Sequence, residues 1–320
     1  SRELMHRAME EIMDGKADTR EIISFLTHLS SKGETAQELT VAAQVMRQRA
    51  ILIKTKHKVI LDTCGTGADQ LGTFNVSTAA AFVAAGSGIC VAKHGNRSVS
   101  GRCGSADILE ALGVNIHLSR EKIEQCLDEI GIAFLFAQDL HPAMKAVNPA
   151  RREIGKRTLF NLLGPLTNPA GATHQLVGVF DRRWIEIMAE ALVGLGAKHI
   201  LVVRGEDGLD EISTTNATSI CEGKIGSIRN FQVVPEDFGF ERRSLKDLAG
   251  GDAEANAKDL IDILKGASGP KQDIVLLNAG AAIYAAEKAG SIKEGVELAR
   301  RSIDSGKAME KLSYLKEASH

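Results

Sequence analysis

The densest group of cationic and small polar side chains lies in the stretch VAKHGNRSVSGRCGSAD, residues 91–107. It brings Lys93, His94, Asn96 and Arg97 together with glycines and serines, directly after an apolar run. Cations, small hydrogen-bond donors and glycine-rich backbone are groups that bind anions in proteins. A lone lysine or arginine is usually a solvated surface charge, but a cluster between an apolar strand and a glycine-rich turn favours an anion site.

A second glycine-rich stretch, LDTCGTGAD at residues 61–69, follows an apolar run and precedes a helical pattern. Gly65 and Gly67 would let backbone N–H groups approach an anion closely. Gln70 stands where a dinucleotide fingerprint requires its third glycine, and the Lys-Ser or Lys-Thr pair of a Walker A loop does not occur. The stretch is therefore an anion loop of another type, or a tight turn that merely needs glycines.

The run TFNVST, residues 73–78, leads into the apolar helical pattern AAAFVAA. We expect Ser77 or Thr78 to cap this helix. A helix N-terminus attracts phosphate through its free N–H groups and its positive dipole end, although plain capping is the alternative. Two anion-binding loops at neighbouring strand ends would suit a ligand with two phosphate groups.

Carboxylates gather in RGEDGLDEIS, which contains Glu206, Asp207, Asp210 and Glu211 and follows the apolar run HILVV. Adjacent carboxylates can hold Mg²⁺, which prefers oxygen ligands and keeps several waters. A solvated acidic turn is the alternative. The metal interpretation gains support from the two phosphate loops, because Mg²⁺ normally accompanies phosphates in protein sites.

Alternating strands and helices must position these loops. Strands are predicted at residues 59–62, 89–94, 132–137, 175–180, 199–205 and 218–223, separated by helical patterns such as residues 182–196. This alternation predicts an α/β fold with a mostly parallel central sheet and helices on both of its faces. Sheets of this type bind ligands at the loops beyond the carboxyl ends of their strands.

Two segments lack this alternation. Residues 1–57 show helical periodicity only, and residues 141–164 are helical and then rich in proline and glycine. We expect a small all-helical domain from residues 1–57 with about 141–164, and a large α/β domain from residues 58–140 and 165–320. A chain of 320 residues is long enough for one large domain and one small domain.

Composition narrows the class of protein. The net charge of −2 gives no general attraction to nucleic acid or membrane surfaces. No apolar run approaches the roughly 18 residues of a membrane span, and the opening SRELMHRAMEEIMDG is charged and helical, unlike a signal peptide. The five cysteines are scattered without a C-x-x-C pair, which argues against a disulfide framework or a zinc site and favours the cytoplasm.

Together, these motifs resemble the anthranilate phosphoribosyltransferase family. The matching motifs are GTGAD (65–69), TFNVST (73–78), KHGNR (93–97), GSAD (104–107), HPAM (141–144), GPLTNP (164–169) and GLDE (208–211). They occur in the family's order, and the resemblance covers nearly the full length. Ala68 replaces the family's usual second glycine, so the affinity for phosphoribosyl diphosphate is the property that we expect to differ.

The resemblance implies a fold like that of pyrimidine nucleoside phosphorylases and a homodimer formed through the helical domains. It implies transfer of the phosphoribosyl group from phosphoribosyl diphosphate to anthranilate in tryptophan biosynthesis, with Mg²⁺ as cofactor. The anthranilate amine would attack C1 of the ribose as diphosphate leaves. No catalytic residue is assigned, because an aromatic amine needs no strong base before attack.

The resemblance also implies which residues bind each ligand. Phosphoribosyl diphosphate is expected at Gly65, Ala68, Asp69, Thr73, Asn75, Val76, Ser77, Thr78, Lys93, His94, Gly95, Asn96, Arg97, Ser98, Val99, Ser100, Gly101 and Ser105. Anthranilate is expected at Gly65, Asn96, His141 and Arg151, with the guanidinium of Arg151 on the carboxylate. Mg²⁺ is expected at Ser77, Asp210 and Glu211.

Two other functions fit parts of this pattern. A pyrimidine nucleoside phosphorylase would share the fold but use inorganic phosphate and a nucleoside. A non-catalytic relative that binds nucleic acid would need a basic surface, which the near-zero net charge disfavours. The KHGNR motif followed closely by GSAD, together with the segment around Arg151, favours the transferase.

Overall fold

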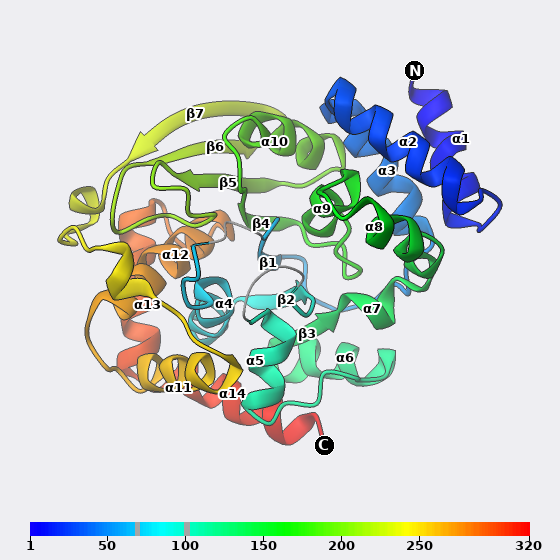
Figure 1. Cartoon of the computed structure of the whole chain (residues 1–320). Coiled ribbons are helices and arrows are strands. Elements are labelled where there is room, and N and C mark those ends of the chain that lie inside the picture. Colours follow the sequence, from blue (N-terminus) through cyan, green and yellow to red (C-terminus); the bar gives the residue numbers. More distant parts are fainter. Residues whose placement is uncertain (68–70, 99–102) are drawn as a thin grey trace.

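The computed structural model describes residues 1–67, 71–98 and 103–320. Its centre is a seven-stranded sheet in the order β3-β2-β1-β4-β5-β6-β7 (Figure 1). The strands are β1 (Ile60–Gly65), β2 (Cys90–Gly95), β3 (Ile132–Phe136), β4 (His174–Gly178), β5 (His199–Gly205), β6 (Thr218–Lys224) and β7 (Ser227–Val233). The first five strands are parallel, and β6 and β7 add an antiparallel hairpin at one edge.

The chain enters this sheet in its middle. It runs outward from β1 to β3 and then returns to place β4 on the other side of β1. Beyond the point where such an order reverses, the loops on the two sides diverge and leave space for a ligand. The carboxyl ends of β1, β2, β4 and β5 are therefore the place where a site is expected.

Two hydrophobic clusters cover opposite faces of the sheet. Along β5, Leu201 and Val203 belong to one cluster and Ile200 and Val202 to the other, as the alternation of side chains along a strand requires. The first face is covered by α4 (Val76–Gly86) and α12 (Pro270–Ala285), and further helices pack around these two. These are α5 (Ser105–Ala111), α11 (Ala253–Leu264), α13 (Ile292–Asp304) and α14 (Lys307–Ala318).

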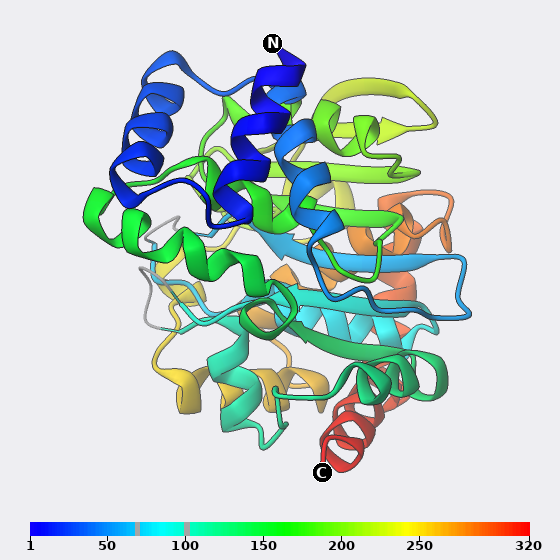
Figure 2. The ribbon, with the colours of Figure 1, turned by 90° about the vertical axis from the view of Figure 1, so that its right-hand side faces the viewer.

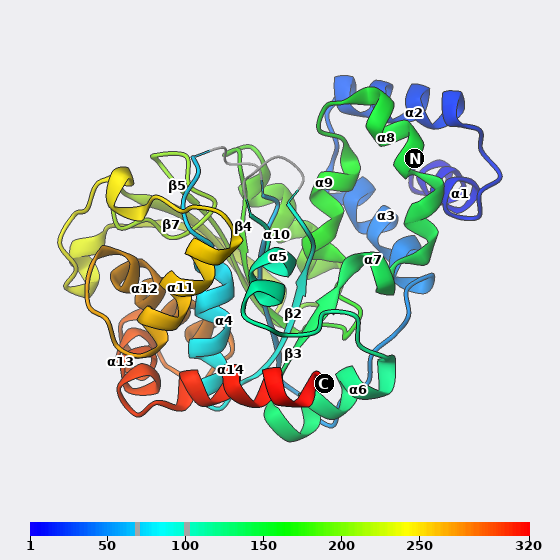
Figure 3. The ribbon, with the colours of Figure 1, turned by 60° about the horizontal axis from the view of Figure 1, so that its bottom comes forward.

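The second face is covered by α10 (Trp184–Gly194), which also contacts the helices of the N-terminal region. Those helices are α1 (Arg2–Met13), α2 (Thr19–Lys32) and α3 (Ala36–Gln48). Capping boxes begin α2 and α3: Asp18 pairs with Glu21, and Thr35 with Glu38. Figures 2 and 3 show this helical group to one side of the sheet, and Figure 2 shows the chain termini at opposite ends of the molecule.

The segment that follows β3 joins the helical group. It consists of α7 (Ala137–Leu140), η2 (Pro142–Ala146), α8 (Asn148–Ile154), α9 (Leu159–Leu163) and η3 (Gly164–Leu166). Helix α8 packs on α2 and α9 on α3, and Val147 and Leu159 share one apolar cluster with Met9 and Leu26. Residues far apart in the sequence thus build one helical body, which the sheet meets through its second face.

The remaining elements are short. Helix α6 (Arg120–Gln125) continues into the π-helical turn η1 (Cys126–Ile130), and 3₁₀ turns occur at η4 (Pro235–Phe238) and η5 (Leu245–Leu248). Across the described ranges, no helix is both long enough and apolar enough to cross a bilayer. The α/β fold class with a helical group and a mostly parallel sheet is confirmed.

Candidate active site

The two central strands β1 and β2 separate at their carboxyl ends. Their backbone pairing stops at Leu61 and Val91, whereas β1 stays paired with β4 as far as Gly65, and β2 with β3 as far as Gly95. We call the opening beyond Leu61 and Val91 the fork. Backbone groups inside the fork have no strand to pair with, so side chains must satisfy them.

Lys93 occupies the fork with its side chain buried. Its Nζ donates to the carbonyl of Thr63 at 2.5 Å and to Ser77 Oγ at 3.2 Å. Burial lowers the pKa of the Lys93 ammonium, and the charges of Asp62 and Glu211 oppose this shift. A cation thus lies fixed beside the first turn of α4, where these two hydrogen bonds go to neutral oxygens.

Asp62 and Asn168 close the base of the fork. Asp62 Oδ1 accepts the backbone N–H of His94 at 3.1 Å, and Oδ2 accepts Asn168 Nδ2 at 2.8 Å. Asn168 Nδ2 also donates to the carbonyl of Ala92 at 2.8 Å. Burial raises the pKa of Asp62 to about 6, against the opposing charge of Lys93. Sequence reasoning missed both residues, although Asn168 lies in the GPLTNP motif.

The start of α4 corrects one prediction. Ser77 and Thr78 were expected to cap this helix, but Asn75 is the N-cap, and its Oδ1 accepts the Thr78 N–H at 3.0 Å. Asn75 Oδ1 also accepts the Ser77 hydroxyl at 3.3 Å. The helix begins earlier than expected because Asn75, itself a favoured capping residue, supplies the cap two residues before Ser77. Ser77 is left with its hydroxyl at the N-terminal turn, beside Lys93.

The carboxylate Asp210 approaches the end of β1 closely. A Cβ atom placed on Gly65 would lie 2.8 Å from Asp210 Oδ2, and one on Gly178 only 1.6 Å from the Asp210 carbonyl. Glycine is therefore required at both positions for this approach. Glu211 is near enough to Lys93 to act on its pKa, so the acidic pair and the fork belong to one site.

The other two carboxylates of this loop have structural partners. Asp207 accepts hydrogen bonds from the hydroxyls of Ser213 and Thr215 and from the backbone of Leu209. Glu206 accepts the hydroxyl of Ser219 at 2.7 Å. Of the acidic cluster in the sequence, Asp210 and Glu211 are the pair near the fork, as the approach of Asp210 to Gly65 and the effect of Glu211 on Lys93 show.

Two buried histidines meet beside the fork. His94 Nε2 and His141 Nε2 lie 3.2 Å apart, and His94 Nδ1 lies 3.1 Å from the carbonyl of Gly164. A carbonyl only accepts, so His94 carries its hydrogen on Nδ1 and presents Nε2 to His141 as an acceptor. Burial lowers the pKa of His94 to about 3 and that of His141 to about 4, so both rings are neutral at ordinary pH.

Arg151 lies on α8 with its side chain half-buried. Burial lowers the pKa of its guanidinium. Within residues 1–67, 71–98 and 103–320, no carboxylate lies at ion-pair distance from Arg151. A half-buried guanidinium without an internal carboxylate is suited to a carboxylate from a ligand.

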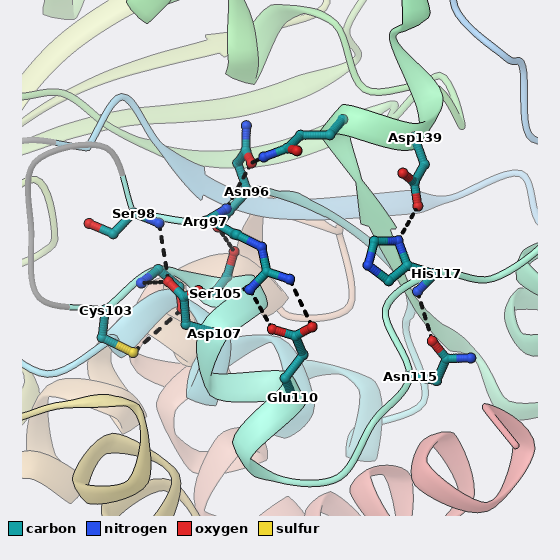
Figure 4. A network of polar contacts seen from close by, with 12 residues as sticks. Asn96, Arg97, Ser98, Cys103, Ser105, Asp107, Glu110, Asn115, His117 and Asp139 are labelled. Atoms are coloured by element: carbon teal, nitrogen blue, oxygen red, sulfur yellow. Dashed lines mark hydrogen bonds and ion pairs between the residues drawn. The ribbon is translucent and has the colours of Figure 1, made fainter.

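The other predicted residues fall into three groups. Gly95, Asn96, Arg97, Ser98 and Ser105 surround the start of α5, where Ser105 Oγ donates to the Asn96 carbonyl at 3.4 Å (Figure 4). The side chains of Val76 and Thr78 are buried, and Thr73 pairs with Ala249. The predicted ligands outside the described residues are Ala68, Asp69, Val99, Ser100 and Gly101.

Comparison with known proteins gives one consistent result. Residues 57–309 match the α/β domain of a glycosyl transferase family, and residues 1–50 match the helical bundle domain of the same name. An anthranilate phosphoribosyltransferase of Anaeromyxobacter dehalogenans is 53% identical over 309 residues, which cover 97% of this chain and 91% of the relative.

Solved structures agree. Anthranilate phosphoribosyltransferase from Thermus thermophilus superposes with a TM-score of 0.94 at 43% identity, over 100% of this chain and 95% of that one. The Saccharomyces cerevisiae enzyme in complex with phosphoribosyl diphosphate and Mg superposes with a TM-score of 0.92 at 29% identity, over 100% and 93%. The resemblance seen in the sequence is thereby confirmed, and the chain belongs to the anthranilate phosphoribosyltransferase family.

Proposed function

We propose that this chain transfers the phosphoribosyl group of phosphoribosyl diphosphate to the amine of anthranilate, in tryptophan biosynthesis. The observation that carries the proposal is the fork, where the buried cation Lys93 lies beside Ser77 at a helix N-terminus. A fixed cation and a helix start together stabilise phosphate charge. The neighbouring carboxylates Asp210 and Glu211 suit the metal that accompanies a diphosphate.

In the proposed reaction, the amine nitrogen forms a bond to C1 of the ribose while the bond from C1 to the diphosphate oxygen breaks. The amine loses a proton, and diphosphate leaves. The contribution of the protein is to place the two reactants and to stabilise the charge that develops on the leaving group. The first anion loop with Thr73 and Asn75, the start of α4, and Lys93 with the backbone and small side chains that follow it as far as Ser105 bind phosphoribosyl diphosphate.

The donor set fits Mg²⁺. In the described part of the chain, no group of three histidine, cysteine, aspartate or glutamate side chains could hold a metal by itself. Mg²⁺ does not need such a cage, because it is usually bound through one or two carboxylates, waters and the phosphates of a substrate. We assign Ser77, Asp210 and Glu211 to it. When bound, Mg²⁺ would neutralise charge on the departing diphosphate.

Anthranilate is assigned to Gly65, Asn96, His141 and Arg151. The guanidinium of Arg151 can bind the planar carboxylate through two parallel hydrogen bonds. His94 and His141 are neutral, so they offer hydrogen bonds without placing a second positive charge near the amine. The amine therefore stays nucleophilic, because neither His94 nor His141 carries a positive charge that would draw electron density from its nitrogen.

The reaction is tested by the loss of anthranilate fluorescence in a mixture of protein, phosphoribosyl diphosphate and Mg²⁺. We expect the loss to require all three components and to stop on addition of EDTA. No loss with folded protein would contradict the proposal, and release of free base from a pyrimidine nucleoside with inorganic phosphate would identify the phosphorylase instead.

The metal assignment has its own test. We expect the double variant Asp210→Asn/Glu211→Gln to lose turnover by on the order of 10³-fold or more, because the leaving diphosphate keeps its charge. The measurement is kcat as a function of Mg²⁺ concentration. A variant whose Mg²⁺ dependence equals that of the wild type would remove both carboxylates from the metal site.

We further infer a homodimer formed through the helical domain of residues 1–57 and 141–164, and a place in the cytoplasm. Leu4 on α1 is a residue that such an interface would cover, because it is apolar and 63% exposed. Light scattering after gel filtration should give twice the chain mass of 34.2 kDa. A monomer at micromolar concentration would contradict the dimer.

A further inference from the structure

Arg97 directs its guanidinium at two carboxylates of α5 (Figure 4). Nη1 and Nη2 donate to the two carboxylate oxygens of Glu110 at 2.5 and 2.8 Å, and Nη1 also donates to Asp107 Oδ1 at 3.1 Å. The guanidinium carbon lies 5.7 Å from the ring centroid of Phe136, at the end of β3. Since a bidentate arginine–carboxylate pair is strongly directional, these contacts set where Arg97 points.

Asp107 connects this side chain to the backbone on both sides of the segment. Its second oxygen, Oδ2, accepts the N–H of Gly104 at 2.8 Å and the N–H of Ser98 at 3.2 Å. A Cβ atom on Gly104 would lie 2.4 Å from the backbone nitrogen of Ser98. The backbone around Gly104 is therefore in direct contact with the backbone around Ser98. We call residues 96–98 and 104–106 the neck.

The charges around the neck differ from those in the fork. Arg97 faces two carboxylates, which outnumber its single positive charge, so a phosphate arriving here would meet net negative charge. Lys93, four residues earlier in the same motif, donates instead to a carbonyl and a hydroxyl, and the carboxylates Asp62 and Glu211 act on its charge from beyond these direct contacts. The two cations of KHGNR are therefore suited to different tasks, and only Lys93 is suited to phosphate.

We propose that Arg97 is a positioning residue, which holds the neck closed through Asp107 and Glu110 and binds no phosphate itself. The inference rests on the proposed function, in which the segment that begins at Lys93 binds phosphoribosyl diphosphate. A loosened neck weakens the binding of that substrate. It leaves the chemical step and the binding of anthranilate nearly unchanged, because Arg151 lies outside the neck and the side chain of Asn96, which is also assigned to anthranilate, is held separately by Gln138 Nε2 at 3.1 Å.

The test is kinetic and uses Arg97→Met in two backgrounds, the wild type and the variant Asp107→Asn/Glu110→Gln. In the wild type we expect the KM for phosphoribosyl diphosphate to rise about five- to tenfold, as for other coupled networks. The KM for anthranilate and kcat should stay within about twofold. In the background without the two carboxylates, Arg97→Met should add less than about a twofold further rise.

Two variants serve as controls. Arg97→Lys keeps the charge but loses the bidentate geometry, so it should raise the KM for phosphoribosyl diphosphate nearly as much as Arg97→Met. Arg120→Met breaks a comparable arginine–glutamate pair, to Glu124 on α6 at 2.9 Å, and should leave that KM unchanged. Circular dichroism melts establish that each variant is folded.

Three results would overturn the inference. One is a rise in the KM for phosphoribosyl diphosphate on Arg97→Met that is as large or larger in the background without the two carboxylates. In that background a guanidinium that binds phosphate would be freed from its carboxylate partners, so its loss would weaken binding more. Another is a wild-type KM in Arg97→Lys together with a raised KM in Arg97→Met. The last is no effect of Arg97→Met at all. Absence of transfer in the wild type would instead contradict the proposed function.

Discussion

The fork between β1 and β2 and the helical segment that carries His141 and Arg151 are built in opposite ways. In the fork, Lys93 and Asp62 are buried and hydrogen-bonded to fixed partners. On α8, Arg151 is half-buried, and the described part of the chain brings no carboxylate to it. One region holds its charges in place by internal bonds, and the other presents a charge without an internal counterion.

This difference indicates a division of work between the two regions. Charges that are already fixed need no rearrangement when charge develops on a leaving group, and this is the condition for electrostatic stabilisation of a transition state. An unpaired guanidinium gains most of its hydrogen bonds when a carboxylate arrives, which suits recognition of a substrate. The fork should therefore govern phosphoribosyl diphosphate and the chemical step, and Arg151 the binding of anthranilate.

Among the single substitutions, the largest effect is expected from Lys93→Met. The change removes the cation but keeps an unbranched side chain of similar length in the fork. We expect kcat/KM for phosphoribosyl diphosphate to fall by on the order of 10²–10³-fold, because phosphate charge is no longer neutralised. Initial rates with varied phosphoribosyl diphosphate measure this. The control is Lys265→Met, at an exposed lysine after α11. If both variants lowered kcat/KM equally, Lys93 would have no special role in binding phosphate in the fork.

A smaller loss is expected from Gly65→Ala. The added methyl group would lie 2.8 Å from Asp210 Oδ2, so the carboxylate must move away from the end of β1. A displacement of this size in a site commonly reduces the rate by about 10²-fold. Titration of activity with Mg²⁺ should show that the variant needs a higher concentration. If the variant reached wild-type activity at the Mg²⁺ concentration that the wild type needs, Asp210 would not be a ligand of the metal.

The histidine pair predicts a dependence of stability on pH. The pKa of His94 is lowered to about 3 and that of His141 to about 4, from 6.5. Between pH 6.5 and about 4, the unfolded chain binds protons on these rings and the folded chain does not, so the free energy of unfolding falls as the pH falls. The slope is about 1.4 kcal/mol per pH unit for each ring.

Urea unfolding at pH 7 and pH 5 measures this slope. His94→Asn/His141→Asn should reduce the slope, whereas His28→Asn, at an exposed histidine, should leave it unchanged. Asp62 acts in the opposite direction, because its raised pKa of about 6 makes the folded chain bind a proton first. An unchanged slope in the double variant would mean that the two rings are accessible to protons.

Much of the fold could be predicted because apolar runs and glycines mark it locally. The expected strands correspond to β1 to β6, and Gly131 ends the helical turn before β3 in a left-handed conformation. Strand β7 was missed because its residues, such as Arg229 and Asn230, are polar and exposed. Only the pairing with β6 makes this segment a strand, and that pairing is not a local property of the sequence.

The partners of the site residues could not be predicted in the same way. The motif KHGNR places Lys93 and Arg97 four residues apart, but the contacts that distinguish them come from Thr63 and Glu110, 30 and 13 residues away. Asp62 was missed because a buried carboxylate cannot be recognised until its donors are known. The position of these groups depends on how β1, β2 and α5 meet, which only the folded structure reveals.

The division of work between the two regions is tested most directly by Arg151→Ala, with the exposed neighbour Arg152→Ala as control. The KM values for both substrates are measured by anthranilate fluorescence. We predict that Arg151→Ala raises the KM for anthranilate by about 10- to 100-fold, the usual loss for hydrogen bonds to a charged group. The KM for phosphoribosyl diphosphate should stay nearly constant. Equal increases in both KM values would contradict a direct contact with the carboxylate and, with it, the separate roles of the fork and Arg151.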